Sequence, residues 1–267
     1  MKEPPLVLIH GYPFDHTIWF STIASLGAHA RVIVPDLPGF GRTPVLTGEV
    51  PSLEAFADFI ARLLDSNEQE TAVVAGMSMG GYVALAFAEK YPARLCGLGM
   101  ISSQAAADTP EARQARMEMI KKIREHGPSV AVEAILPKMF AGEKGKNQEL
   151  AKYPTEGASG AGVGGLCWAL EAMARRPDRS AFLRSLSLPV LFVHGSEDKI
   201  ISGTKAREFA ESCQKPILVE LAGVGHASPL EAPDQVASGL ARLMEKCREE
   251  SMTRSSGGSE SSTLTAA

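Results

Sequence analysis

Residues 71–90 read TAVVAGMSMGGYVALAFAEK, and this stretch carries the strongest structural signal in the chain. Its first five residues are mostly apolar and partly β-branched, which favours a buried strand, whereas its last nine favour a helix. Residues 76–80 between them have the pattern G-x-S-x-G. A strand, a sharp turn and a helix form the setting in which this pattern lifts a serine hydroxyl above a sheet. The stretch therefore predicts an α/β fold with Ser78 as a candidate nucleophile.

A Gly-Ser turn is also an ordinary connection in α/β proteins, so the catalytic interpretation needs a histidine and an acid. An apolar run at residues 188–193 leads to Asp198, and another at residues 217–221 leads to His226. Both candidates follow predicted strands, and the carboxyl ends of parallel strands meet at one edge of a sheet. The order serine, acid, histidine differs from the orders found in chymotrypsin and subtilisin.

These residue types divide the chemistry of nucleophilic catalysis between them. His226 takes the proton of the Ser78 hydroxyl during attack, because a serine hydroxyl is a poor nucleophile at neutral pH. Asp198 holds the imidazole in the correct tautomer and stabilises the imidazolium. His226 is the only histidine after Asp198. Glu197 is the rival acid, and the regular run that resumes at residues 199–201 favours Asp198.

Further motifs resemble those of the α/β-hydrolase superfamily. The matching pieces are HGYP at residues 10–13 with Trp19 downstream, PDLPGFGR at residues 35–42, the serine motif with Gly81, HGSED at residues 194–198, and Gly225-His226. The chain is most similar to the compact branch with carboxylesterases, enol-lactone hydrolases, haloperoxidase-like perhydrolases and C–C bond hydrolases. Epoxide hydrolases and haloalkane dehalogenases share part of the pattern but use an aspartate nucleophile, so Ser78 argues against both.

An acyl-transfer enzyme needs two fixed N–H donors where the carbonyl oxygen becomes an oxyanion. In α/β hydrolases they come from the residue after the nucleophile and from the loop after the first central strand. The backbone N–H groups of Met79 and Tyr12 are therefore expected to form the oxyanion hole, since Pro13 has no N–H. His10, which stands between an apolar run and a glycine, is interpreted as a residue that shapes this loop.

The resemblance implies a mostly parallel central sheet flanked by helices. The first apolar run begins at Leu6, within a few residues of Met1. The N-terminal hairpin that opens many relatives is therefore expected to be missing, which leaves about six strands.

The alternation of strands and helices breaks between about residues 103 and 180, where only segments of helical composition occur. We expect residues 1–102 and 181–250 to form the hydrolase core and residues 103–180 to form a helical cap over the active-site edge. Residues 251–267 are rich in Ser, Thr and Gly, which predicts a disordered tail.

The cap is expected to determine specificity. It is rich in methionine, and it contributes Met139, Phe140 and Trp168 as candidate substrate-binding residues. Flexible thioethers and large aromatic rings suit a pliable apolar pocket wall. The alternative is that these side chains only pack the cap helices onto the core.

Composition limits the other function classes. The chain has 267 residues, of which 45% are hydrophobic and 22% are charged, with a formal net charge of −4. This charge and the absence of basic runs argue against a nucleic-acid partner, and no apolar stretch is long enough for a membrane span. The four cysteines lack the spacing of metal sites, so reduced thiols, a cytoplasmic location and no metal or cofactor are expected.

The sequence thus predicts a serine hydrolase that cleaves carboxylic esters through Ser78, His226 and Asp198 by way of an acyl-enzyme. The expected partner is a small-molecule ester or lactone, and the expected assembly is a monomer or small homo-oligomer. A lactonase, a C–C bond hydrolase or a perhydrolase with the same triad remains open. A non-catalytic small-molecule receptor is a further alternative, although such relatives often lose a member of the triad.

Overall fold

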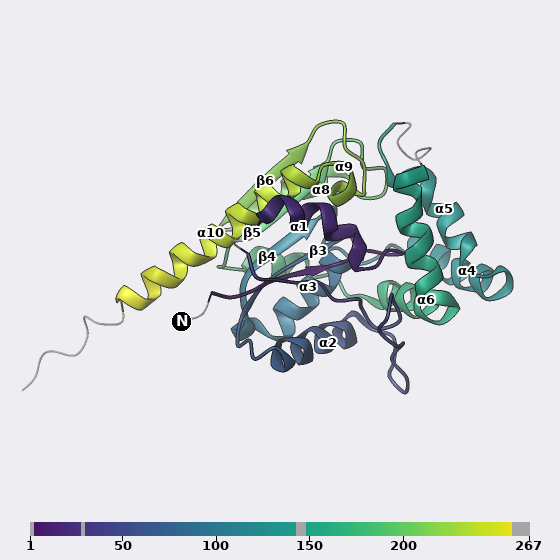
Figure 1. The fold of residues 1–267 in the computed structure, drawn as a ribbon, viewed down its shortest axis with the longest axis horizontal. Helices are drawn as coiled ribbons and strands as arrows, with labels where there is room; N and C mark the ends of the chain where they lie inside the picture. The colour runs from purple at the N-terminus through teal and green to yellow at the C-terminus, as the bar shows by residue number, and fades with distance from the viewer. Residues whose placement is uncertain (1–2, 28–29, 143–147, 258–267) are drawn as a thin grey trace, which may run out of the picture.

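The computed structural model describes residues 3–27, 30–142 and 148–257. Its centre is a six-stranded sheet in which every neighbouring pair of strands is parallel (Figure 1). The spatial order is β2-β1-β3-β4-β5-β6. The strands are β1 (Leu6–Ile9), β2 (Val32–Ile33), β3 (Ala72–Met77), β4 (Leu95–Ile101), β5 (Val190–Gly195) and β6 (Pro216–Leu221). This sheet confirms the predicted fold class and number of strands.

Helices cover both faces of the sheet, as Figure 1 shows for α1 and α10 on one side and α2 and α3 on the other. The helices are α1 (Phe20–Leu26), α2 (Leu53–Ser66), α3 (Met79–Lys90), α4 (Pro110–His126), α5 (Ser129–Met139), α6 (Gln148–Arg175), α7 (Ser180–Ser185), α8 (Gly203–Ser212), α9 (Ser228–Glu231) and α10 (Pro233–Gly257). Short 3₁₀ helices span His16–Trp19 and Pro92–Arg94.

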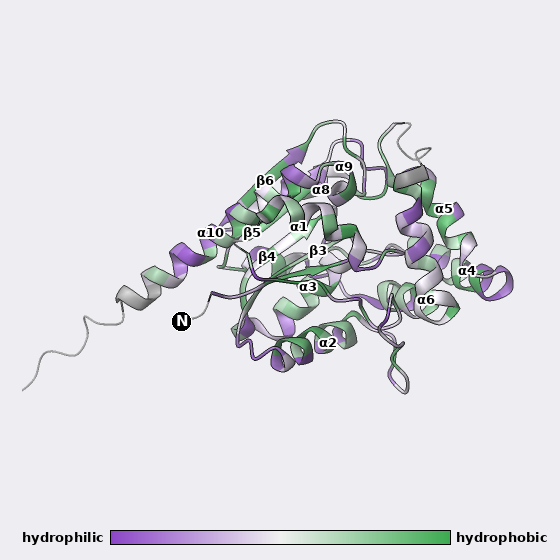
Figure 2. Cartoon of the chain, viewed as in Figure 1, coloured by the Kyte–Doolittle hydropathy of each residue, from purple (hydrophilic) through white to green (hydrophobic). Residues whose placement is uncertain are grey.

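The two-residue period of the strands explains this layering. In β1, Val7 and Ile9 belong to the apolar cluster shared with α2 and α3, whereas Leu6 and Leu8 belong to the cluster shared with α10. All four side chains are fully buried. Figure 2 accordingly shows β1 as hydrophobic along its length, with hydrophilic residues on α10 and at the outer end of α4. The sheet is therefore buried on both faces, as parallel sheets are.

Four helices, α4 to α7, lie between β4 and β5 in the chain, and α4, α5 and α6 pack on one another at one end of the sheet (Figure 1). The glycines of α6 allow close contact with the loops of the core. A side chain at Gly157 would collide with the carbonyl oxygen of Pro13, and one at Gly165 would collide with Gly39. Gly162 interrupts the helix with a φ of +60°.

Side-chain caps fix where α2 and α4 begin. The Ser52 side chain accepts the N–H of Ala55 at the start of α2, and the Thr109 side chain accepts the N–H of Ala112 at the start of α4. Such N-caps satisfy backbone donors that have no acceptor within the helix.

The predicted tail boundary at Ser251 is wrong, because α10 continues without a break to Gly257. Residues 258–267 lie outside the described part of the chain. Across the residues that are described, no helix combines the length and apolar character that crossing a membrane demands.

The turn from β3 into α3 is tightly packed. A Cβ at Gly76 would collide with the backbone of Gly80, and a Cβ at Gly80 would collide with the carbonyl oxygen of Ile9. Glycines here are thus required by the close approach of α3 to β3 and β1, as expected for G-x-S-x-G.

We predict that Gly80→Ala lowers the free energy of unfolding by about 2–4 kcal/mol or prevents folding, because backbone atoms cannot move away from the added methyl group. Gly164→Ala is the matched control, since no atom lies within 4 Å of a Cβ at that position of α6. Alanine there is expected to be neutral or stabilising by up to about 1 kcal/mol. Urea denaturation measures both, and equal stabilities of the two variants would contradict the packing argument.

Candidate active site

The parallel sheet brings the predicted site residues to one edge. Ser78 directly follows β3, Asp198 lies three residues after β5, and His226 lies five residues after β6. The loop with Tyr12 follows β1 at the same edge. The N–H of Ser78 donates to the carbonyl oxygen of Ile101 at 2.8 Å, which continues the β3–β4 ladder into the turn.

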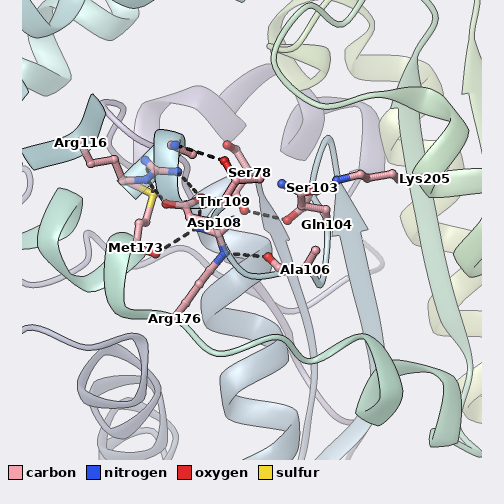
Figure 3. A network of polar contacts seen from close by, with 11 residues as sticks. Ser78, Ser103, Gln104, Ala106, Asp108, Thr109, Arg116, Met173, Arg176 and Lys205 are labelled. Atoms are coloured by element: carbon pink, nitrogen blue, oxygen red, sulfur yellow. Dashed lines mark hydrogen bonds and ion pairs between the residues drawn. The ribbon is translucent and has the colours of Figure 1, made fainter. Parts of the chain in front are cut away.

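Ser78 has φ +52° and ψ −112°, a conformation that non-glycine residues rarely adopt. Its backbone is held on both sides of the serine. The Ser78 carbonyl oxygen accepts the N–H groups of Gly81 at 3.0 Å and Tyr82 at 3.3 Å. It also accepts the hydroxyl of Ser103 at 2.8 Å (Figure 3). Strain of this kind persists where the surrounding structure fixes it, and it is typical of functional sites.

Asp198 and His226 form a buried pair. Asp198 Oδ2 lies 2.8 Å from His226 Nδ1, and the two side chains are 0% and 1% exposed. Asp198 Oδ1 accepts the N–H groups of Ile200 at 2.8 Å and Ile201 at 2.9 Å. Burial alone raises the pKa of the Asp198 carboxyl, but the His226 ring and these two N–H groups outweigh it and hold the pKa below its usual value. The carboxylate is therefore ionised at neutral pH and fixes the orientation of the ring.

The rival acid Glu197 has a different partner. Its Oε2 accepts the N–H of Gly142 at 3.2 Å, on the segment that follows α5. With Nδ1 of His226 engaged by Asp198, Nε2 is the ring nitrogen left to accept a proton from a nucleophile. The hydrogen bonds among the described residues include none between Ser78 Oγ and His226, and such bonds often tighten only when substrate is bound.

The loop after β1 lies directly against the candidate nucleophile. A Cβ at Gly11 would lie 3.3 Å from Ser78 Cβ and 3.0 Å from the carbonyl oxygen of Met77. The next residue, Tyr12, is one of the two expected oxyanion donors. The other, Met79, begins α3, and the first N–H groups of a helix have no acceptor within it. The ring of His10 shapes this loop as expected, since its Nε2 accepts the N–H of Leu37 at 3.0 Å.

The three predicted substrate-binding residues are all buried. Met139 and Phe140 are 0% and 1% exposed and belong to the apolar cluster that includes β5 and α10. Trp168 is 8% exposed, and its ring centroid lies 4.5 Å from that of Phe56 in α2. Met139 and Phe140 thus belong to a different apolar cluster from Trp168, and Ile135 and Leu136 of α5 pack against both clusters. Contact with substrate stays a prediction for all three.

Polar residues after β4 form a network that sequence reasoning missed. Figure 3 shows this loop between Ser78 and the side chains of Arg116, Met173 and Arg176. Arg176 Nη1 lies 2.7 Å from Asp108 Oδ1. Arg116, eight residues after Asp108, also donates from Nε to Asp108 Oδ2 at 2.5 Å. Sequence spacing alone could have suggested the contact with Arg116, but not the contact with Arg176, which lies 68 residues away.

Asp15, His16 and Asp36 form the one cluster of possible metal ligands among the described residues. Their groups are already used within the protein. Asp36 Oδ1 accepts the N–H of His16 at 2.9 Å and lies 2.7 Å from its Nδ1. Asp15 Oδ1 accepts the N–H of Thr17 at 2.9 Å. The cluster thereby connects the loop after β1 with the loop after β2.

Comparisons with known proteins agree with this geometry. The model of the alpha/beta hydrolase family matches residues 6–238. A 3-oxoadipate enol-lactonase from Acinetobacter baylyi is 26% identical over 248 residues, covering 91% of each chain. A pimeloyl-[acyl-carrier protein] methyl ester esterase from Aromatoleum aromaticum is 28% identical over 254 residues, covering 89% of this chain and 96% of that protein.

Among solved structures, a thermophilic esterase from Thermogutta terrifontis superposes with a TM-score of 0.86 at 34% sequence identity. The match covers 91% of this chain and 90% of the esterase. The family match spans the sheet, the serine turn and the Asp198–His226 pair, and relatives of this kind support hydrolytic activity. The chain therefore belongs to the alpha/beta hydrolase family.

Proposed function

We propose that the chain is a carboxylic-ester hydrolase that uses Ser78 as nucleophile, His226 as general base and Asp198 as the acid that orients the base. The observation that carries this proposal is the strained Ser78 turn at the same sheet edge as the buried Asp198–His226 pair. Nucleophilic catalysis by a serine needs a neighbouring base and a group that orients the base, and a strained backbone of this kind is typical of functional sites.

The mechanism follows from the roles of these groups. Ser78 Oγ attacks the ester carbonyl carbon while Nε2 of His226 takes the hydroxyl proton. The N–H groups of Tyr12 and Met79 stabilise the oxyanion of the tetrahedral intermediate. His226 then returns the proton to the leaving alcohol, and an acyl-enzyme remains on Ser78. Water activated by the same imidazole releases the acid and restores the serine.

Residues 103–180 act as a cap over the core formed by residues 1–102 and 181–250. Helices α4 to α6 stand at one end of the sheet (Figure 1), and α6 packs on the loop that carries Tyr12 through Gly157. The cap thereby selects a small ester or lactone, and Met139, Phe140 and Trp168 contribute its apolar wall. The names of the relatives, an enol-lactonase, a methyl ester esterase and a thermophilic esterase, support this substrate class.

A cyclic ester is the second candidate substrate, because one relative is named as an enol-lactonase. Lactones and open esters share the same acylation step, and they differ in whether the leaving alcohol stays attached to the acyl group. Comparing turnover of a lactone and an open ester of similar size separates the two.

We predict that wild-type protein hydrolyses p-nitrophenyl esters and that Ser78→Ala loses this activity by at least about 10³-fold with its fold intact. A series from acetate to decanoate measures the size of the acyl pocket, with circular dichroism as the check of folding. Activity that survives Ser78→Ala would exclude Ser78 as the nucleophile. Inactivity of folded wild type on every ester and lactone would exclude the ester-hydrolase assignment.

Asp198→Asn is expected to lower kcat by about 10³–10⁴-fold, because an amide favours the wrong imidazole tautomer. Glu197→Gln is the matched control, and its kcat is expected to stay within about threefold of wild type, since a glutamine oxygen still accepts the N–H of Gly142. Steady-state kinetics on the best ester measures both variants. The opposite ranking would assign the acid role to Glu197.

The lowered pKa of Asp198 also predicts how stability depends on pH. A group with a folded pKa below its unfolded value of about 3.9 stabilises the fold above that value and loses this effect as pH falls through the folded pKa. The stability difference between wild type and Asp198→Asn should therefore be largest near pH 7 and shrink below about pH 4. Urea denaturation at pH 7, 5 and 3.5 tests this, and a difference that grows toward acid would contradict it.

A further inference from the structure

The loop that carries His226 is hydrogen-bonded to the end of α5. The carbonyl oxygen of Met139 accepts the N–H groups of His226 at 2.9 Å and Ala227 at 3.0 Å. The backbone of the candidate base is thus fixed by a residue 87 positions earlier in the chain, and not by its own strand alone. The position of His226 depends on where residues 139–142 lie.

Glu231 joins the same two segments a second time. Its Oε1 accepts the N–H of Gly225 at 3.0 Å, and its Oε2 accepts the N–H of Ala141 at 3.0 Å. The N–H of Glu231 itself donates to the carbonyl oxygen of Ala227 at 3.1 Å, within α9. The carboxylate of Glu231 therefore joins the residue before His226 to the segment after α5, and the backbone N–H of Glu231 donates to the residue after His226.

The space around Gly225 shows how closely the two segments approach. A Cβ at Gly225 would lie 2.5 Å from the backbone nitrogen of Ala141 and 2.8 Å from Glu231 Oε1. Its φ is not in the positive range, so the glycine is required by this backbone contact and not by its conformation. Because no side chain fits between the segments, a shift of one moves the other.

The two hydrogen bonds that Glu231 accepts, from Gly225 and Ala141, require a carboxylate. Two backbone N–H groups from different segments face one side chain, and an ionised glutamate offers an acceptor oxygen to each. A glutamine keeps one acceptor and turns an NH₂ group toward the second N–H, which leaves two donors facing each other. Glu231→Gln therefore removes one of the two hydrogen bonds while it preserves the size of the side chain.

We propose that Glu231 is a positioning residue that holds the segment Met139–Gly142 against Gly225 and thereby sets the place of His226 relative to Ser78. The inference rests on the proposed role of His226 as general base. Glu231 acts through His226, since its two carboxylate oxygens face backbone N–H groups. Its loss consequently lowers kcat more than it raises KM.

The test compares wild type, Ser78→Ala and Glu231→Gln on the best p-nitrophenyl ester. For Glu231→Gln we expect kcat to fall by about 10–100-fold, because a catalytic group displaced by about 1 Å costs about 10²-fold in rate. KM is expected to stay within about twofold. Glu249→Gln is the matched control, since its carboxylate pairs with Lys246 on an exposed face of α10, and its kcat is expected to equal that of wild type.

Hydrogen–deuterium exchange provides a readout that does not need turnover. In Glu231→Gln, peptides covering residues 139–142 and 223–227 are expected to exchange faster, with the rest of the chain unchanged. Unchanged exchange in both peptides, or unchanged kcat beside a Ser78-dependent wild type, would overturn the proposal. If all peptides of Glu231→Gln exchanged faster, and kcat fell only in proportion to the folded fraction, Glu231 would have a merely structural role. That result would also overturn the proposal.

If Glu231→Gln does not fold, Glu231→Asp serves with the same readouts, because it keeps the charge but is one methylene too short to reach both N–H groups. Wild-type turnover that does not depend on Ser78 would remove the proposed function. The exchange measurement would still decide whether Glu231 joins the two segments, so the two failures are distinguishable.

Discussion

The close approach of β3 and α3 around Ser78 is the constraint on which the rest of the structure depends. Two glycines allow it, since a side chain at Gly76 would meet α3 and one at Gly80 would meet the end of β1. This approach forces Ser78 into a positive φ and places its hydroxyl at the carboxyl edge of the sheet. The cost of the strained residue is offset by burial of the sheet on both faces, which fixes the strands that hold the turn.

The parallel sheet gathers the remaining groups, and contacts with the segment after α5 hold the loop of His226. Asp198 and His226 are brought to the edge by β5 and β6, and their mutual hydrogen bond is buried. The carbonyl oxygen of Met139 and the carboxylate of Glu231 then connect the loop of His226 to the end of α5 and the segment after it. Under the proposed function, the segment after α5 both lines the substrate pocket and holds the loop of the proposed base, so substrate selection and the position of His226 are physically connected.

Local patterns predicted the sheet, the serine turn and the order of the three candidate residues, because strand periodicity and glycine spacing can be recognised within short stretches of sequence. Contacts between distant segments could not be predicted this way. Nothing near Glu231 in sequence indicates that its partner is Ala141, 90 residues earlier. The tail boundary at Ser251 was wrong because the composition was judged over the last 17 residues together. The first residues of that segment continue α10 to Gly257.

The most direct test of the central claim is covalent labelling with a fluorophosphonate, which reacts with serines activated by a neighbouring base. Intact mass and peptide mapping of the native protein should show one adduct, located on Ser78. His226→Ala should suppress the adduct while the fold remains. Labelling of another residue, or a folded wild-type protein that takes no label, would contradict the account of Ser78 as an activated nucleophile.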